Sequence, residues 1–489
     1  MLSFIDRDYS RQIQVLYFIK NSFSPVTTDE IADHIGSSTK TVLAILPVIK
    51  NDISMLNFNL KKTKDRKYYL KSEIKDRQIC LDEYILFCGK RSLVFSIIEE
   101  LFHKEKINTV EFCNKRYISQ ATFSRGKKKI IELLAICDLK LPTYLNGGII
   151  GNENKIRIFY LNFFFSFYGS VEWPFEENIK NNFERFFELK LGELFTSINP
   201  KEKNKFYYLI YIIKKRVIKG ELIHEKMISF EEVENYEKYY NFMREYLGIY
   251  KITDAAIIKN ETNFFICAIY TQEIVEFNLS SSFSKNKFEK VIVNLWLDEL
   301  KKQFNQLITN EEEKFWENRL DLLHISYKYL YYPKKLFSKY ELFENNIEKY
   351  NPELLKKTHE FFFELMKNKH YKEYRQTQLA HISQSSIIEE YYHYLYCFFY
   401  SLKKITKIPI FISDSVGKIT KIIIEKQLKI IFGDNIVMRN KIDNQVELIV
   451  TSEAYHKNGI DVFIIYSYQD EKVFYKITNR IQEKIYKQL

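Results

Sequence analysis

The sequence predicts a mainly α-helical protein of several domains that ends in a small α/β domain. Its 489 residues are enough for about three to five domains, and an apolar fraction of 46% can bury several cores. Apolar residues recur at helical spacing through most of the chain. After residue 405, continuous apolar runs alternate with helical stretches, which is typical of a parallel sheet covered by helices.

Composition excludes several classes of protein. No apolar run approaches the roughly 18 residues of a membrane span, and residues 1–8 lack a signal-peptide pattern. The six cysteines are scattered, without CxxC pairs or histidines at ligand spacing. We therefore expect a cytoplasmic protein with reduced thiols, with neither a metal nor another cofactor, and without contact to a membrane.

Positive charge is concentrated in the first third of the chain. Of the net charge of +11, residues 1–165 carry +8, from 26 Lys and Arg against 18 Asp and Glu. The remaining 324 residues hold 48 Lys and Arg against 45 Asp and Glu, a net charge of +3. This asymmetry indicates a polyanion-binding head on a nearly neutral body, although AT-rich coding bias also favours lysine.

Residues 119–136 form the most informative stretch and predict one helix. Ser119 is a good N-cap, and one apolar stripe follows at helical spacing: Phe123, Ile130, Leu133 and Leu134. The other face opens with short polar side chains, which can approach base edges in a major groove, and continues with cations, which can meet phosphates. The alternative is a solvated surface helix. The predicted DNA-contacting residues are Ser119, Gln120, Thr122, Ser124, Arg125, Lys127, Lys128 and Lys129.

Residues 1–72 predict a winged helix-turn-helix. A helix over 8–20 precedes a capping box from Thr27 to Glu30, and Gly36 ends the second helix. A third helix begins at Ser37 or Ser38 and contains Pro47, which is unfavourable in a helix interior. Two short strands, 57–60 and 68–70, then flank a basic tip. The predicted DNA contacts are Ser38, Thr39, Lys40 and Thr41 on the helix, and Lys61, Lys62, Lys64, Arg66 and Lys67 on the wing. The alternative is a small three-helix packing unit.

The same order of elements repeats over residues 73–168. A helix over 93–102 and a short helix capped by Thr109 lead to a turn at 117–118 and the helix from Ser119. A hairpin with its turn at 146–148 follows, and a new helix begins at 155–157. Two tandem units of the same order are harder to attribute to chance than one.

Two stretches of the second unit resemble the Mga/AtxA family of PRD-containing virulence transcriptional regulators. The first reads S-x-x-T-x-x-R over 119–125, and the second reads G-x-E-x-x-I-R over 151–157. The resemblance is most specific over 90–160. It implies two DNA-binding domains, two helical domains like PTS-regulation domains (PRDs), and a C-terminal domain like the EIIB component of sugar phosphotransferases.

The expected organisation has five domains. A linker at 280–282, followed by 285–287, separates the two halves of the helical middle. The domains are a winged helix-turn-helix over 1–72, an Mga-type helix-turn-helix over 73–168, PRD-like helical domains over 169–283 and 284–403, and an EIIB-like α/β domain over 404–489.

The resemblance implies phosphorylation on histidine by phosphocarriers of sugar transport. The main candidates are His224, His324 and His359, and the others are His370, His381 and His393. His224 follows a basic stretch over 214–216, whereas the tyrosines around His393 indicate packed core. For each histidine, an ordinary structural or solvated role is the alternative.

The C-terminal domain is predicted to hold strands at 408–412, 436–438, 446–451 and 462–466, a helix over 419–432, and a closing helix over 474–489. The loop over 413–418 could hold a phosphate, although the spacing of a P-loop is absent. An EIIB enzyme carries its phosphoryl group on a cysteine at this loop, and 405–489 contains no cysteine. We therefore expect an interaction or dimerisation module.

Together these patterns predict a DNA-binding transcriptional regulator, an activator of virulence or carbon-responsive genes, and not an enzyme. The expected partners are double-stranded DNA, a second copy of the chain in a homodimer or higher oligomer, and PTS phosphocarrier proteins. One alternative is a PRD-containing RNA-binding antiterminator, whose head would be a small β-sheet. Another is an enzyme using histidine and carboxylates of the helical middle, for which no paired-carboxylate, nucleophile or metal motif is found.

Overall fold

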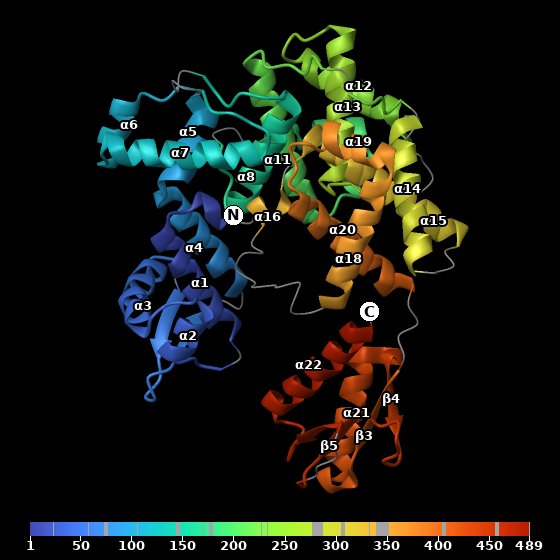
Figure 1. Ribbon diagram of the computed structural model, residues 1–489. Helices are drawn as coiled ribbons and strands as arrows, with labels where there is room; N and C mark the ends of the chain where they lie inside the picture. Colours follow the sequence, from blue (N-terminus) through green and yellow to red (C-terminus); the bar gives the residue numbers. More distant parts are fainter. Residues whose placement is uncertain are drawn as a thin grey trace. The chain divides into compact units, whose positions relative to one another are not determined.

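The computed structural model consists of two compact units, Met1–Glu344 with Lys367–Ile382, and Asn345–Met366 with Ser383–Leu489. Most of the described residues are helical (Figure 1). None of the described helices is both long and apolar enough to cross a membrane. The predicted linker at 280–282 and the turn residue Asn146 lie outside the described residues. The structure describes residues 1–488 except 23, 57, 73–76, 105, 143–146, 170, 176–178, 226, 232, 276–286, 305–308, 332, 339–351, 403–406 and 455–458.

The predicted helix-turn-helix and wing are present at the start of the first unit. Its elements are α1 (Arg7–Asn21), α2 (Thr28–His34), α3 (Thr39–Ser54), β1 (Phe58–Lys62) and β2 (Tyr68–Ser72). The capping box of Thr27 and Glu30 is formed, and α3 continues through Pro47. The two strands pair antiparallel with Leu60 opposite Leu70, which confirms the wing.

A second set of helices follows, with one unpredicted helix and three corrections, of which the first is that Asn108 rather than Thr109 caps the short helix before the turn at 117–118. The elements are α4 (Arg77–Arg91), α5 (Leu93–Lys104), α6 (Thr109–Arg116) and α7 (Gln120–Ile136), of which α4 was not predicted. Among the described residues, the predicted hairpin is represented by an isolated antiparallel bridge between Lys140 and Ile150, and 143–146 lie outside them. The next helix begins at Glu153, earlier than predicted, because the Asn152 side chain accepts from the Asn154 backbone N–H and caps it.

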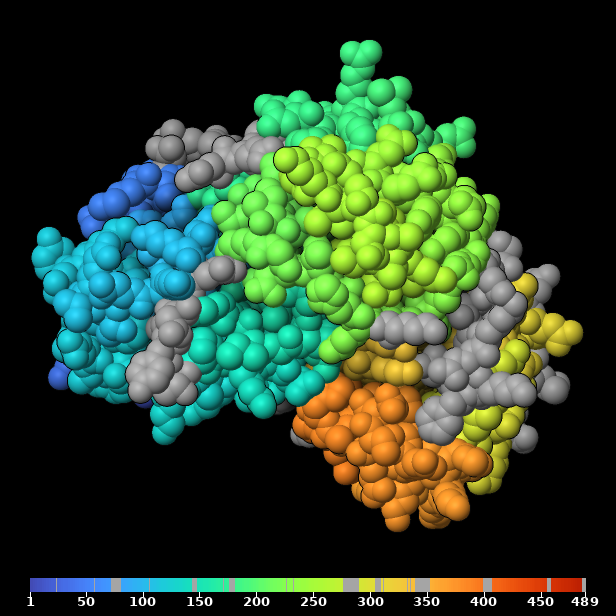
Figure 2. All heavy atoms as spheres, turned by 90° about the horizontal axis from the view of Figure 1, so that it is seen from above, coloured from blue at the N-terminus to red at the C-terminus, as the bar shows by residue number. Residues whose placement is uncertain are grey.

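Helix α8 (Glu153–Tyr168) is the spine of the first unit. It is buried over most of its length, with polar residues concentrated in its first turns and aromatic residues beyond them, and it packs against α4 and α11. Figure 2 shows the cyan surface of the second helical set adjoining the teal and green surface of the helices that follow it. These helices are α9 (Ile179–Leu191), α10 (Glu193–Thr196), α11 (Pro200–Ile218), α12 (Tyr236–Gly248), α13 (Ala255–Thr271), α14 (Lys287–Phe304), α15 (Asn310–Ile325), the π-helix η2 (Ser326–Leu330), α16 (Lys334–Phe337) and α19 (Lys369–Thr377).

The second unit contains the α/β domain. Helices α18 (Pro352–Lys367) and α20 (Gln384–Leu402) precede a parallel sheet of order β4-β3-β5-β6. The strands are β3 (Ile408–Ile412), β4 (Ile436–Arg439), β5 (Leu448–Thr451) and β6 (Asp461–Ile464), with helices α21 (Lys418–Phe432) and α22 (Glu471–Gln488). Each pairing is parallel, as predicted from the alternation of strands and helices. Helix α22 begins three residues earlier than predicted.

Candidate nucleic-acid interface

Helix α7 begins with a side-chain cap, as predicted. The Ser119 Oγ accepts a hydrogen bond from the Thr122 N–H at 3.1 Å and lies 2.9 Å from the Thr122 Oγ1. The cap satisfies one of the backbone N–H groups that a helix start leaves without an intrahelical partner. It also fixes the first turn of α7, so the side chains that follow project from a rigid support.

One face of α7 is buried and anchors the helix. The predicted stripe is confirmed, and the Phe123 and Phe112 rings meet edge to face at 5.4 Å between centroids. Gly126 is buried as well, because a Cβ there would lie 2.7 Å from the Leu93 Cδ2 of α5. The glycine therefore permits the close approach of α5 and α7.

The opposite face of α7 carries most of the predicted contact residues. The exposed members are Ser119, Gln120, Ser124, Arg125 and Lys128, whereas Thr122 and Lys127 are half-buried. An amide, a hydroxyl, a guanidinium and an ammonium thus share one face within about two turns. These are the donor and acceptor types that bind base edges and phosphates.

Lys129 does not belong to this face. Its Nζ donates to the Ile5 carbonyl at 3.2 Å, in a partly buried position. Because successive helical residues are rotated by about 100°, the third lysine of the run points back toward the N-terminal segment while Lys128 points outward. We therefore correct the prediction for Lys129 to a structural contact.

The turn before α7 exposes a residue that the sequence did not single out. Tyr117 adopts the left-handed conformation, with φ 53° and ψ 42°, and its side chain is 97% exposed. A tyrosine in this conformation is unusual and is tolerated where the turn fixes it. The available signal was a tight turn between two helices without a glycine, at a position beside the Ser119 cap.

Helix α3 begins with the same cap as α7. The Ser38 Oγ accepts from the Thr41 N–H at 3.2 Å and lies 2.9 Å from the Thr41 Oγ1. The Thr39 hydroxyl donates to the Asp29 Oδ1 at 2.9 Å, which ties α3 to α2 and occupies that predicted contact residue. Ser38 and Lys40 are exposed, whereas Thr39 and Thr41 are half-buried.

The exposed face of α3 then becomes apolar, which the sequence analysis did not predict. Leu43 and Val48 are 50% and 44% exposed, and Ala44 and Pro47 are exposed between them. The sequence contained the evidence for this face, because these four hydrocarbon side chains lie on the side of the helix opposite the buried stripe of Val42, Leu46 and Ile49.

The wing presents its five cations to solvent. Lys61, Lys62, Lys64, Arg66 and Lys67 are all exposed. The tip is ordered by the Thr63 Oγ1, which accepts from the Lys67 N–H at 3.1 Å, and Arg66 lies in the left-handed region with φ 61°. A cationic hairpin of this kind suits contact with phosphates rather than base edges.

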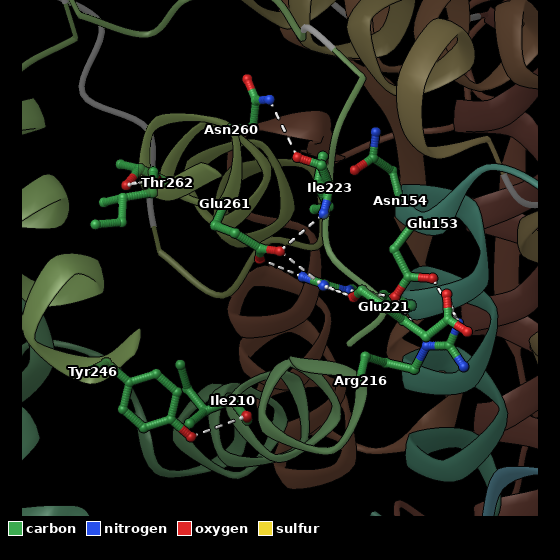
Figure 3. Close-up of polar contacts among 12 residues, drawn as sticks. Glu153, Asn154, Ile210, Arg216, Glu221, Ile223, Tyr246, Asn260, Glu261 and Thr262 are labelled. Carbon is green, nitrogen blue, oxygen red and sulfur yellow. Dashed lines mark hydrogen bonds and ion pairs between the residues drawn. The ribbon is translucent and has the colours of Figure 1, made fainter. Parts of the chain in front are cut away.

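The G-x-E-x-x-I-R motif forms a buried ion-pair network, not a nucleic-acid contact. Arg157 is fully buried and pairs with Glu261 through its two terminal nitrogens at 2.5 and 2.9 Å, and its Nε reaches Glu153 at 2.8 Å. Glu153 in turn binds Arg216 at 2.9 and 2.7 Å (Figure 3). The network joins the start of α8 to α11 and α13.

Charge compensation keeps Arg157 ionised in this interior position. Burial alone would lower the pKa of Arg157, but the carboxylates of Glu261 and Glu153 outweigh burial and raise the pKa. Its remaining terminal N–H donates to the Glu221 carbonyl at 2.9 Å. A pair this deeply buried is strongly destabilised when one partner alone is removed.

A cavity of about 570 Å³ lies beside this network. It is lined by the 147–154 segment, Arg216 and residues 221–225, including the exposed His224. His224 is thus a solvent-accessible candidate near Glu221 and Glu225, so its surroundings are less basic than the sequence suggested.

The other histidines differ in access. His324 is 1% exposed, its Nδ1 lies 3.0 Å from the Tyr374 hydroxyl, and burial lowers its pKa to about 3. His359 is exposed on α18. His393 is also exposed, which corrects the expectation of packed core, because its position on α20 faces away from the buried Tyr391 and Leu395.

The hydroxyl-rich loop of the α/β domain is held by its own side chains. The Ser415 Oγ lies 3.1 Å from the Thr451 Oγ1 and accepts from the Ser452 N–H at 3.3 Å. The Lys421 Nζ donates to Asp414 at 2.6 Å, and this bond lowers the pKa of Asp414. The polar groups of this loop are therefore hydrogen-bonded to one another.

Comparisons with known proteins agree with this arrangement. Residues 77–164 match the family model described as the Mga helix-turn-helix domain. The chain is 27% identical over 220 residues to the capsule synthesis positive regulator AcpB of Bacillus anthracis, and 24% identical over 223 residues to AcpA of the same organism. It is 23% identical over 235 residues to the anthrax toxin expression trans-acting positive regulator of Bacillus anthracis.

Each of these alignments covers 44% or 45% of the chain and the same share of the relative, so the match spans less than half of either protein. The matched family domain holds α4 to α7 and most of α8, and thus includes the capped helix with the exposed polar face. Residues 77–164 are therefore similar to the Mga helix-turn-helix domain, and less than half of the chain is similar to proteins named as positive regulators of capsule synthesis and anthrax toxin expression.

Proposed function

We propose that the chain is a sequence-reading DNA-binding activator of transcription, with α7 in a major groove and the wing on the phosphate backbone. The observation that carries the proposal is the exposed face of α7, where Gln120, Ser124, Arg125 and Lys128 project from a capped helix. The relatives named as positive regulators of capsule and toxin genes support activation and a virulence setting.

The test is binding to duplexes selected by the full chain from a random 40-base-pair library. Arg125→Ala combined with Lys128→Ala is expected to weaken binding about 10-fold or more, because each lost base or phosphate contact is worth about 1 kcal/mol. Lys201→Ala with Lys372→Ala removes the same charge from exposed positions of the helical middle and serves as the matched control. Equal affinity of the Arg125 and Lys128 double variant and the wild type would overturn the placement of α7.

The RNA-binding antiterminator remains the second candidate. Competition of the selected duplex with RNA hairpins separates the two, and the proposal expects the duplex to be bound more tightly. The described N-terminal strands form a two-stranded wing on helices, which suits a duplex groove better than a single-stranded loop.

A homodimer through the C-terminal domain is part of the proposal. Helix α21 carries an unusual set of exposed apolar residues, and a second copy of the chain would cover them: Ile419 at 72%, Ile422 at 48%, Ile430 at 83% and Ile431 at 53%. Light scattering should give twice the mass of the chain for the wild type and a monomer for Ile419→Lys with Ile430→Lys. An unchanged mass in that variant would exclude this face.

Regulation by sugar-transport phosphocarriers is the remaining part of the proposal. Of the three main candidate histidines, His224 and His359 are exposed. A phosphoryl group on His224 would add negative charge beside Glu221 and Glu225, and would disfavour the packing of 221–225 near the start of α8. Incubation with the phosphocarrier system should label the wild type and not His224→Ala with His359→Ala. Labelling of that variant to the same extent would point to other residues.

A further inference from the structure

The two capped helices of the head share the serine and threonine of the cap but present different surfaces beyond it. When the two helices are aligned on Ser38 of α3 and Ser119 of α7, Leu43 takes the place of Ser124. In the same alignment, α3 has Ala44 where α7 has Arg125, and Pro47 where α7 has Lys128. At these three outward positions, groups that can form hydrogen bonds are thus exchanged for hydrocarbon.

These residues of α3 are outward-facing by geometry and not misplaced core. Lys40, Ala44 and Pro47 follow one line along the helix, with Leu43 and Val48 on either side of it. The opposite side of α3 supplies the buried stripe, whereas Leu43 and Val48 remain 50% and 44% exposed. The apolar face is therefore available to a partner.

The surroundings of this face identify the kind of partner. Residues 38–71 hold eight Lys and Arg against two Asp, a net of +6, and β1 of the cationic wing packs against α3. A polyanion is complementary to this charge. In the major groove of duplex DNA, the 5-methyl group of thymine is the chemical group that apolar side chains contact.

We propose that α3 reads thymine methyl groups through Leu43 and Ala44, with Val48 beside them. The preferred duplex then contains a T-rich segment read by apolar contact, in addition to the segment that α7 reads by hydrogen bonds. The inference rests on the proposed function and adds the class of base that one helix selects.

The test uses duplexes that the full chain selects from the random 40-base-pair library. Deoxyuridine replaces thymidine in one half of the selected duplex at a time, which removes only the 5-methyl group and leaves the pairing edges intact. Each lost methyl contact is expected to weaken binding about fourfold, since burial of one methylene-sized group is worth about 0.8 kcal/mol. The effect should appear only where the replaced stretch includes the T-rich segment that α3 reads.

A variant assigns that effect to α3. Leu43→Ser, which installs the residue type that α7 has at this position, should bind the thymidine duplex less tightly and lose most of its response to deoxyuridine. Ile218→Ser changes an equally apolar residue, 58% exposed at the end of α11, and should keep the full response.

The outcomes separate the inference from the proposed function. Failure to enrich any duplex overturns both. Tight duplex binding that ignores deoxyuridine in either half overturns the thymine inference alone. Loss of affinity in Leu43→Ser that is equal for thymidine and deoxyuridine duplexes also overturns it, because the face would then serve a different contact.

Discussion

The two helix-turn-helix units of the head are built alike and anchored differently. Both place a capped helix outward, with the same serine and threonine at the cap. The second helix-turn-helix is joined to the helical middle through α8, by the fully buried ion pair of Arg157 and Glu261. In the first helix-turn-helix, Asp52 of α3 pairs with Arg91 of α4 at 3.4 Å, and the arginine side chain is 44% exposed. The comparison teaches that two similarly capped helices can be attached to their neighbours by ion pairs of very different burial.

The largest expected effect tests the buried ion pair that anchors the second helix-turn-helix. Glu261→Ala leaves the Arg157 guanidinium buried without its main partner, and should lower the free energy of unfolding of the first unit by about 3–5 kcal/mol. Urea unfolding followed by circular dichroism measures the change. Glu231→Ala breaks the exposed pair with Lys259 and is the control, with an expected loss of about 1 kcal/mol or less. Similar losses in both variants would mean that the buried network is not the anchor.

An effect of intermediate size is expected in the pH dependence of stability, to which the buried His324 of the helical middle contributes. The pKa of His324 is lowered to about 3 in the fold, whereas the unfolded chain has a histidine pKa near 6.5. The unfolded state therefore binds more protons below pH 6.5, and stability falls as the pH decreases. Between pH 7 and pH 5 the loss should be about 2 kcal/mol.

His324→Gln should flatten this part of the stability profile, because glutamine does not titrate and can still meet the Tyr374 hydroxyl. His34→Gln, on α2 of the first unit, is the matched control and should leave the pH dependence of unfolding in place. A profile in His324→Gln as steep as that of the wild type would show that the acid sensitivity arises elsewhere.

The smallest effect sharpens the contrast between the wing and α7. Lys61→Ala with Lys64→Ala should weaken binding by a similar factor on all duplexes, and should reduce the slope of log affinity against log salt by about 1.8, since each phosphate contact contributes about 0.9. Arg125→Ala should instead alter which duplexes are preferred. Binding measured at several salt concentrations on two unrelated duplexes provides both readings, and a wing variant that changes sequence preference would reverse the roles.

Much of the head was predictable because its signals are local. The cap at Ser119, the capping box at Thr27 and the wing around the basic tip each depend on neighbours within a few residues. The parallel sheet of the second unit followed from continuous apolar runs for the same reason. The polar face of α7 was predicted except for Lys129, whose contact with Ile5 joins residues far apart in the sequence.

The sequence by itself determined the caps that begin α2, α3 and α7, the buried stripe of α7, and the concentration of positive charge in the first third. These properties depend on side-chain spacing and on caps, which the chain encodes within single turns. Only the tertiary structure decided that the G-x-E-x-x-I-R motif forms a buried clamp with Glu261, that His324 is enclosed, and that the apolar residues of α3 stay outside. Those facts depend on which distant segment covers a side chain, and burial against a partner is not encoded at any single position.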